Sequence, residues 1–293
     1  MRISTNYQYT TYQYDLQIAD GKLANVSQEL SSGKRINEPS DDPVGLGQAM
    51  SMQSLQDGIT QYLSNLNTAN GALGTVDSTL SAMSTQMNQA YSLAVQGASS
   101  TMDQNSLNAL VSQITQIQSQ IVNLANAQGP TGAYLFAGQK TDAKPYTVQN
   151  GNLVFNGDTN LINAEIGPGQ TLQTNVVGEP MISTMYNNLE ALKNDLSGGN
   201  IGAISDIDIT NIQSSQAAIS TTRGQVGAKM QTVSSLTSQY QIQSDNLTKS
   251  ISSLTDVDMA SAAVQYQEAS QAYSAALTVV GQGSTLSLLD FIK

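Results

Sequence analysis

The sequence predicts a mainly α-helical protein: a long antiparallel helical bundle or coiled coil with a small β-containing insert, in which the N- and C-terminal helices pair. Three observations support this expectation. Apolar residues recur at alternating steps of three and four at both ends of the chain. An inner stretch keeps the same spacing for about forty residues, and the periodicity is lost between about residues 130 and 180. A helix of that length is typical of bundles rather than compact globules.

The first predicted helix carries an unbroken heptad stripe. Gly33 suits the left-handed position just after a helix, and Lys34 and Arg35 follow near the negative end of the helix dipole, so we expect the helix to end there. The stripe consists of Tyr9, Tyr12, Leu16, Ala19, Leu23, Val26 and Leu30.

The polar stretch "SSGKRINEPSDDPVG", residues 31–45, is predicted to end one helix and start the next. Pro43 suits the first helical position and Asp42 the N-cap. Asp41 and Asp42 could instead form a catalytic or metal-binding pair, but capping accounts for them better. For Asp256 and Asp258 we likewise favour first-turn positions, and "TDVD" fits a capping box with Thr255 as the N-cap.

The inner helices continue the same spacing. One long stripe comprises Leu55, Ile59, Tyr62, Leu66, Ala69, Leu73, Val76, Leu80, Met83, Met87, Ala90 and Ala94. A second stripe covers residues 107–124, and helical periodicity returns around residues 181–196 and 209–254. The final helix carries Met259, Ala262, Tyr266, Ala269, Tyr273, Ala276 and Val280.

The middle of the chain is predicted to contain short strands. The segments "YLFAG", "YTVQNGNLVFNGD" and "AEIGPGQTLQTNVVG" have strand-like composition, with Asn150-Gly151 set for a two-residue hairpin turn and Gly167-Pro168-Gly169 for another turn. We therefore divide the chain into a terminal assembly helix with corner loop (1–42), an inner helical domain in two halves (43–129 and 201–254), a β-containing outer domain (130–200) and a C-terminal assembly helix (255–293).

Composition argues against several classes of function. The chain carries 11 Lys and Arg against 22 Asp and Glu, a net charge of −11, so we expect no binding to nucleic acid or to anionic membranes. It has no Cys and no His, which removes thiol and imidazole chemistry and the usual zinc ligands. No apolar run is long enough to span a bilayer. We expect no enzyme, no cofactor and no metal site.

The terminal helices have little apolar surface to bury, because Ala and Tyr on their stripes are bordered by Ser, Gln, Asn and Thr. We infer that they gain partners from neighbouring subunits. The tail "LSLLDFIK" is also expected to be buried against a partner, and its bulky apolar residues are Leu286, Leu288, Leu289, Phe291 and Ile292.

Several motifs resemble the flagellin superfamily. "ELSSGKRINEPSDDPVG" is similar to the N-terminal signature of that superfamily and "TLSLLDFIK" to its C-terminal ending. The Pro-Ser-Asp-Asp-Pro form, "QYLSNLNTANGAL" and "ANAQGPTGAYLFAGQKTDAKPY" resemble the branch found at the hook–filament junction, whereas "GLGQA" leans toward flagellin, which stays the alternative. A secreted helical adhesin or type III translocator is a more remote alternative, because it does not account for the paired terminal motifs.

The resemblance implies a structural protein of the extracellular flagellum, assembled as a homo-oligomeric layer between the other junction protein and flagellin. It also implies export through the flagellar type III apparatus and a chaperone that binds the C-terminal segment. We expect the charged corner to contact adjacent subunits and to add register and specificity more than affinity. The expected assembly interface comprises Tyr9, Tyr12, Leu16, Leu23, Val26, Leu30, Lys34, Arg35, Asp41, Asp42, Met259, Tyr266, Tyr273 and Val280.

Overall fold

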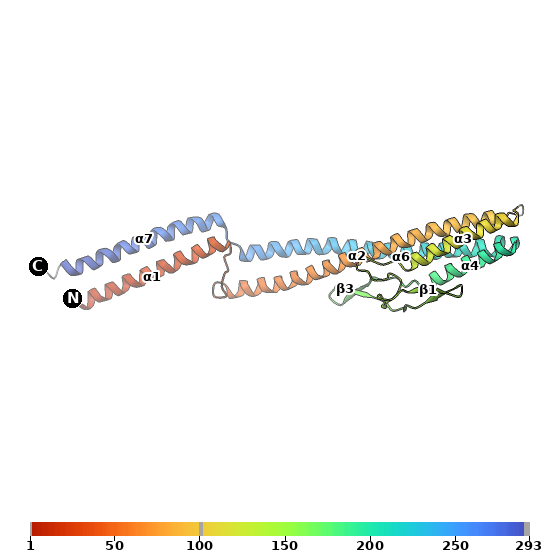
Figure 1. Cartoon of the computed structure of the whole chain (residues 1–293). Coiled ribbons are helices and arrows are strands. Elements are labelled where there is room, and N and C mark those ends of the chain that lie inside the picture. Colours follow the sequence, from red (N-terminus) through yellow and green to blue (C-terminus); the bar gives the residue numbers. More distant parts are fainter. Residues whose placement is uncertain (1, 100–101, 290–293) are drawn as a thin grey trace. The chain divides into compact units, whose positions relative to one another are not determined.

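A computed structural model describes residues 2–99 and 102–289, and most of them are helical (Figure 1). The chain divides into two compact units, one formed by residues 1–58 with 243–293 and the other by residues 59–242. None of the described helices is long and apolar enough to cross a membrane. The predicted segment boundaries at 42/43, 129/130, 200/201 and 254/255 stay predictions.

In the first unit, the two terminal helices lie side by side and antiparallel (Figure 1). They are α1 (Arg2–Ser32) and α7 (Met259–Leu289). The predicted α1 stripe faces α7: Tyr12, Leu16, Leu23 and Leu30 are half-buried there and Val26 is buried. On α7, the small residues Ala262 and Ala269 are buried. We call this contact the seam. It buries few large side chains, so the pair has a small core of its own.

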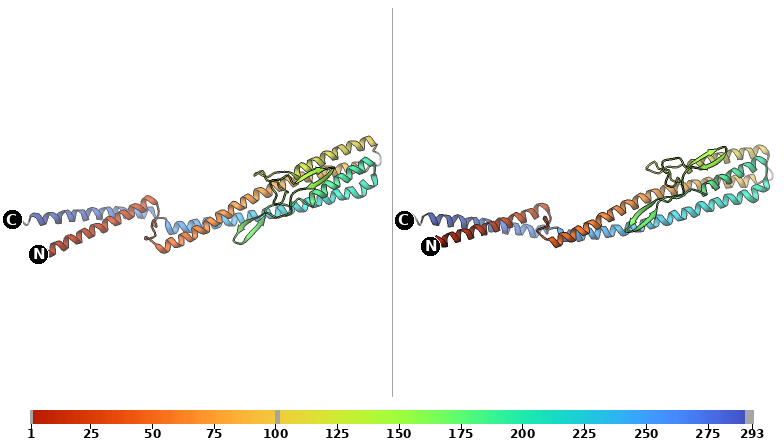
Figure 2. Two further views of the ribbon diagram at one scale, coloured as in Figure 1. Left: turned by 60° about the horizontal axis from the view of Figure 1, so that its bottom comes forward. Right: turned by 90° about the horizontal axis from the view of Figure 1, so that it is seen from below.

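In the second unit, the long helices run alongside one another in both views of Figure 2. They are α2 (Pro43–Gly97), α3 (Gln104–Ala125), α4 (Met181–Gly198) and α6 (Ile209–Thr255), of which the second unit holds all but the start of α2 and the end of α6. The core confirms the heptad prediction from Leu66 to Ala94, where every predicted stripe residue is buried. The predicted fold class, a mainly helical bundle with paired terminal helices and a small β insert, is likewise confirmed.

The heptad prediction is wrong at one position of α2. Leu55 is 60% exposed, and the half-buried side chain in that turn belongs to Gln56, whose Nε2 donates to Ser244 Oγ on α6 at 2.6 Å. The inward positions there are Ala49, Met52, Gln56 and Ile59, which also follow steps of three and four. Leu55 and Gln56 belong to two neighbouring stripes that both follow steps of three and four. Packing against α6 buries the stripe that contains Gln56, which is the more polar one.

The β insert consists of two separate hairpins. Strands β1 (Tyr146–Gln149) and β2 (Asn152–Phe155) pair antiparallel through the predicted turn, where Asn150 has φ 51° and Gly151 φ 80°. Strands β3 (Asn163–Gly167) and β4 (Gln170–Gln173) pair through a turn in which Gly169 has φ 68°. Both turns need the left-handed backbone that glycine or asparagine tolerates.

The prediction of a strand at "YLFAG", residues 134–138, is wrong. Tyr134 makes only an isolated bridge with Gln128, and the N–H of Leu135 bonds to the carbonyl of Ala127 at 3.0 Å instead of joining a ladder. Phe136 and Ala137 are fully buried. The apolar run therefore reflects a buried loop, and a short run of this kind does not distinguish a strand from other buried segments.

The second hairpin is tied to the helices of its unit. The Tyr240 hydroxyl on α6 donates to the carbonyl of Ile166 at 2.8 Å, and the Asn65 amide on α2 donates to the carbonyl of Glu165 at 2.7 Å. The ring of Tyr62 lies 5.8 Å from that of Tyr240. These contacts hold the hairpin against α2 and α6 through backbone acceptors, independently of its own side chains.

The connection from α4 to α6 contains a feature that the sequence did not indicate. Gly199, φ 66°, ends α4 at the predicted pause, and the chain then forms the short helix α5 (Ile201–Ala203) and a π-helical turn, η1 (Ile204–Asp208). Asp208 at the end of this turn is only 1% exposed, and its Oδ2 has no hydrogen-bond partner among the described residues. A buried carboxyl in this state carries a cost in stability.

Candidate assembly interface

Two connections meet at one corner of the first unit. The corner loop, residues 33–42, links α1 to α2, and the return connection, residues 256–258, links α6 to α7. The N–H of Arg35 bonds to the carbonyl of Thr255 at 2.7 Å, and the N–H of Val257 bonds to the carbonyl of Gly33 at 3.1 Å. Lys34 and Asp256 thus form an antiparallel bridge. We call this bridge, with its side-chain contacts, the clasp.

The clasp includes an ion pair between two residues far apart in the sequence. Lys34 Nζ contacts Asp256 Oδ1 and also lies 3.4 Å from Thr255 Oγ1. The hydrogen bond from Lys34, followed by one from the Ser252 hydroxyl, lowers the pKa of Asp256 from 3.8 to about 2. Both side chains are partly exposed, so the ion pair aligns the two connections more than it adds to the free energy of unfolding.

Arg35 joins three elements at the same corner. Its Nη2 donates to the carbonyl of Leu254, in the last turn of α6, at 2.8 Å, and lies 3.3 Å from Asp42 Oδ2. A guanidinium at a helix C-terminus satisfies a carbonyl that has no partner within the helix. Arg35 therefore has partners within its own chain, while 48% of its side chain remains accessible to a neighbouring molecule.

The two adjacent aspartates of the corner loop perform different tasks. Asp42 caps α2 as predicted, because its Oδ1 accepts the N–H of Gly45 at 2.8 Å. Asp41 Oδ2 instead accepts the N–H groups of Asn37 and Glu38, at 2.9 and 2.8 Å, and closes the loop on itself. These backbone hydrogen bonds lower the pKa of both carboxyls.

The predicted capping box at Thr255 and the predicted first-turn positions of Asp256 and Asp258 are wrong, because α6 extends to Thr255 and α7 begins only at Met259. The cap of α7 is Asp258, whose Oδ1 accepts the N–H of Ala260 at 3.0 Å. The Thr255 hydroxyl donates back to the carbonyl of Ile251 at 2.9 Å. The strand-like bridge of the clasp occupies the residues that a capping box would have used.

The terminal helices also carry apolar side chains that face away from the seam. Of the predicted interface residues, the structure places Tyr12, Leu16, Leu23, Val26, Leu30, Tyr273 and Val280 at buried or half-buried positions of the terminal helices, and Tyr9, Met259 and Tyr266 at exposed ones. Sequence reasoning missed Ile18, Val264, Leu277 and Val279 because they fall outside the heptad positions. The outer apolar residues are 40% to 75% exposed: Tyr7, Tyr9, Tyr14, Ile18, Met259, Val264, Tyr266, Leu277 and Val279.

The tail residues are only partly covered by the structure. Leu286, Leu288 and Leu289 belong to the last turns of α7, and their side chains lie outside the described part. Phe291 and Ile292 lie outside the described residues altogether. Within residues 2–99 and 102–289, no group of three or more acidic side chains is arranged to hold a metal ion.

Comparison with known proteins places these features in a family. Residues 3–141 match the family described as the bacterial flagellin N-terminal helical region, and residues 209–292 match the bacterial flagellin C-terminal helical region. The chain belongs to the flagellin superfamily. In this superfamily member, the two matched regions are the ones that the clasp joins, and the β insert lies in the unmatched middle.

Individual relatives of this flagellin-superfamily chain differ in how much they cover. Flagellar hook-associated protein 3 of Salmonella typhimurium is 27% identical over 292 residues, 91% of this chain and 92% of that protein. A flagellin of Salmonella paratyphi A is 29% identical over 170 residues, 58% of this chain but only 33% of that flagellin. The crystal structure of Bacillus cereus FlgL has a similar fold, with a TM-score of 0.61 and 21% identity over 69% of this chain and 99% of that chain.

Proposed function

We propose that this protein is a structural subunit of the bacterial flagellum that joins the hook to the filament. The observation that supports this most directly is the extent of similarity: the match to hook-associated protein 3 spans nearly all of both chains, whereas the match to flagellin covers a third of that protein. Flagellin remains the alternative.

The terminal helix pair would be the assembly element. Its seam buries little, and a row of outer apolar residues would remain in water on an isolated subunit. A surface of this kind is stabilised when it is covered by a partner. Neighbouring copies in a layer would cover these residues, and the clasp would present both helices as one element.

The finer assignments follow from the same role. We infer contacts with the other junction protein on the hook side and with flagellin on the filament side. An export chaperone would cover the C-terminal segment before the type III export apparatus takes the chain out of the cell. The functional location would then be the extracellular flagellum, and the role would be structural and not catalytic.

Complementation tests this function. In the bacterium that carries this chain, deletion of its gene should leave hooks without attached filaments while flagellin is still exported, and the intact gene should restore attachment. Immunogold labelling should then place the protein at one position between hook and filament. Label along the whole filament would instead identify a flagellin.

Seeded assembly separates the two candidates in purified protein. Short flagellin filaments are offered to the protein under salting-out conditions, and the products are viewed by negative-stain electron microscopy. An adaptor should form no long filament of its own, because its contacts suit unlike neighbours. Long filaments would favour the flagellin alternative.

A further inference from the structure

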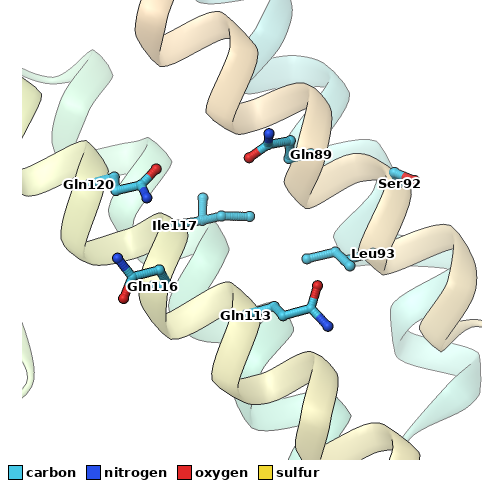
Figure 3. A pocket seen from close by; sticks show the side chains of 7 residues that line it. All are labelled: Gln89, Ser92, Leu93, Gln113, Gln116, Ile117 and Gln120. Atoms are coloured by element: carbon cyan, nitrogen blue, oxygen red, sulfur yellow. The ribbon is translucent and has the colours of Figure 1, made fainter.

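A groove between α2 and α3 in the second unit has no role in the terminal assembly element. It has a volume of about 430 Å³. Leu93 of α2 and Ile117 of α3 point toward each other across it, with amide side chains around them (Figure 3). Its lining residues are Gln89, Ser92, Leu93, Gln113, Gln116, Ile117 and Gln120.

The four glutamine amides of this groove have no hydrogen-bond partner within the described part of the chain. Other glutamines of the same bundle do: Gln104 Nε2 donates to the carbonyl of Ser197 at 3.1 Å, Gln118 Nε2 to Glu190 at 2.9 Å and Gln216 Nε2 to Asn88 at 2.8 Å. The groove thus concentrates free amide donors and acceptors beside a small apolar floor.

The groove also lies in the longest uncharged part of the chain. Residues 78–102 and 104–139 contain no Asp, Glu, Lys or Arg, although the protein has a net charge of −11. Across the same bundle, α4 carries Glu190, Lys193 and Asp195. Two copies of so acidic a chain repel each other, and an uncharged face is where they approach at the least electrostatic cost.

We propose that the α2–α3 groove is a contact surface for a second copy of this protein. An amide both donates and accepts hydrogen bonds, so a neutral, amide- and hydroxyl-bearing helix of another copy satisfies the free glutamines. A cationic partner gains no ion pair there, and a wholly apolar partner leaves the amides without partners, which costs free energy. The inference rests on the proposed function, because it assigns this contact to the layer of subunits in the flagellum.

Single-cysteine cross-linking tests the contact, because the natural chain has no cysteine. Gln116→Cys places one thiol in the groove, and Asn194→Cys, on an exposed position of α4, is the matched control. Flagella are isolated from cells that express each variant, labelled at the thiol with a benzophenone maleimide and irradiated, so that the labelled position cross-links to whichever chain lies beside it. We expect a dimer of this protein with Gln116→Cys and at least roughly tenfold less with Asn194→Cys.

A charge variant tests the energetic argument. Gln113→Glu combined with Gln116→Glu places two like charges in the groove, and Asn194→Glu is the control. Because a charge covered by a neutral helix loses its hydration and gains no ion pair, the double variant should reduce the amount of protein per flagellum by roughly tenfold, while the control changes it little. Circular dichroism of both purified variants should match the parent, since all three positions are exposed.

The outcomes separate the inference from the function. Equal amounts of dimer from Gln116→Cys and Asn194→Cys would overturn the second-copy contact, and so would cross-linking of Gln116→Cys only to a different protein. The proposed function stands in both cases. Absence of the protein from flagella overturns the proposed function. The contact is then tested with the same two cysteine variants as purified proteins, which are made to associate with ammonium sulfate. Only a dimer that forms with Gln116→Cys and not with Asn194→Cys supports the contact.

Discussion

Lys34 and Asp256, separated by 222 residues in the sequence, form an ion pair within an antiparallel bridge that joins the two connections of the terminal helices. The corner loop is therefore more than a turn between α1 and α2. It is the place where the two ends of the chain are brought into register, and its charges act first within the subunit.

The first prediction concerns the titration of Asp256. Its pKa is lowered to about 2, so the stability that the ion pair contributes is present above the ordinary pKa of 3.8 and is lost as pH falls through about 2. Lys34→Met should raise the pKa of Asp256 toward 3.8, as measured by NMR titration of the carboxyl carbon. An unchanged pKa would mean that the Ser252 and Thr255 hydroxyls hold the carboxylate, and Ser252→Ala is the variant that separates their contributions.

The second prediction concerns the Arg35 guanidinium. Arg35→Ala removes the donor to the Leu254 carbonyl and to Asp42, which should destabilise the clasp by about 1 kcal/mol. The backbone amides of Arg35 and Val257 should then exchange hydrogen severalfold faster. Lys249→Ala, at an exposed position of α6, is the control and should leave both amides unchanged.

The same variant examines the role of the corner in assembly. If Arg35 also contacts neighbouring subunits, Arg35→Ala should weaken the attachment of filaments to hooks under shear, beyond the effect of Lys34→Met. Attachment as strong as in the parent would restrict Arg35 to its contacts within the chain.

The third prediction compares two glycines at the start of α2. A Cβ on Gly45 would lie 2.4 Å from Asp42 Oδ2 and 3.0 Å from Ile36 Cδ1, so Gly45→Ala displaces the N-cap and should cost about 1 kcal/mol in urea unfolding. A Cβ on Gly47 meets nothing within 4 Å, and Gly47→Ala should stabilise the helix by up to about 1 kcal/mol. Effects of equal sign at both positions would contradict the crowding argument.

The fourth prediction concerns the buried carboxyl of the π-helical turn. Burial, and then the neighbouring Asp195, raise the pKa of Asp208 to about 6 from 3.8. Because the folded state holds this proton more tightly, its contribution to stability is present below pH 3.8 and is lost as pH rises through about 6. Above that pH, Asp208→Asn should stabilise the protein by about 2 to 3 kcal/mol.

Urea unfolding at pH 5 and pH 8 measures this effect. The stabilisation by Asp208→Asn should be larger at the higher pH, and the exposed Asp206→Asn in the same turn should show no such difference. A pH-independent effect of Asp208→Asn would assign the gain to packing or hydrogen bonding of the amide rather than to the proton.

Local patterns predicted the parts of the fold that depend on neighbouring residues. The heptad spacing from Leu66 to Ala94 identified the buried face of α2, and the Asp42-Pro43 pair marked the start of that helix, because burial and capping both follow short-range rules. The Asn150-Gly151 turn was predicted for the same reason, since it requires a positive φ at both residues.

The predictions failed where contacts between segments far apart in the sequence determine the structure. Leu55 and Gln56 lie on competing stripes, and only the contact with Ser244 on α6 selects between them. Thr255 resembled the N-cap of the last helix, but it ends α6, and Asp256 after it forms the bridge with Lys34 of the corner loop. Nothing near Lys34 in the sequence indicates Asp256 as its partner, so the clasp required the structure.

The antiparallel seam and the clasp together determine how the first unit would respond to a mechanical load. The described ends of α1 and α7 lie at the same end of the pair, so tension that draws these ends apart would separate the helices one turn at a time. Each step breaks few contacts, because the seam buries few large side chains. The rupture would stop at Lys34 and Asp256, where backbone hydrogen bonds and an ion pair must break together.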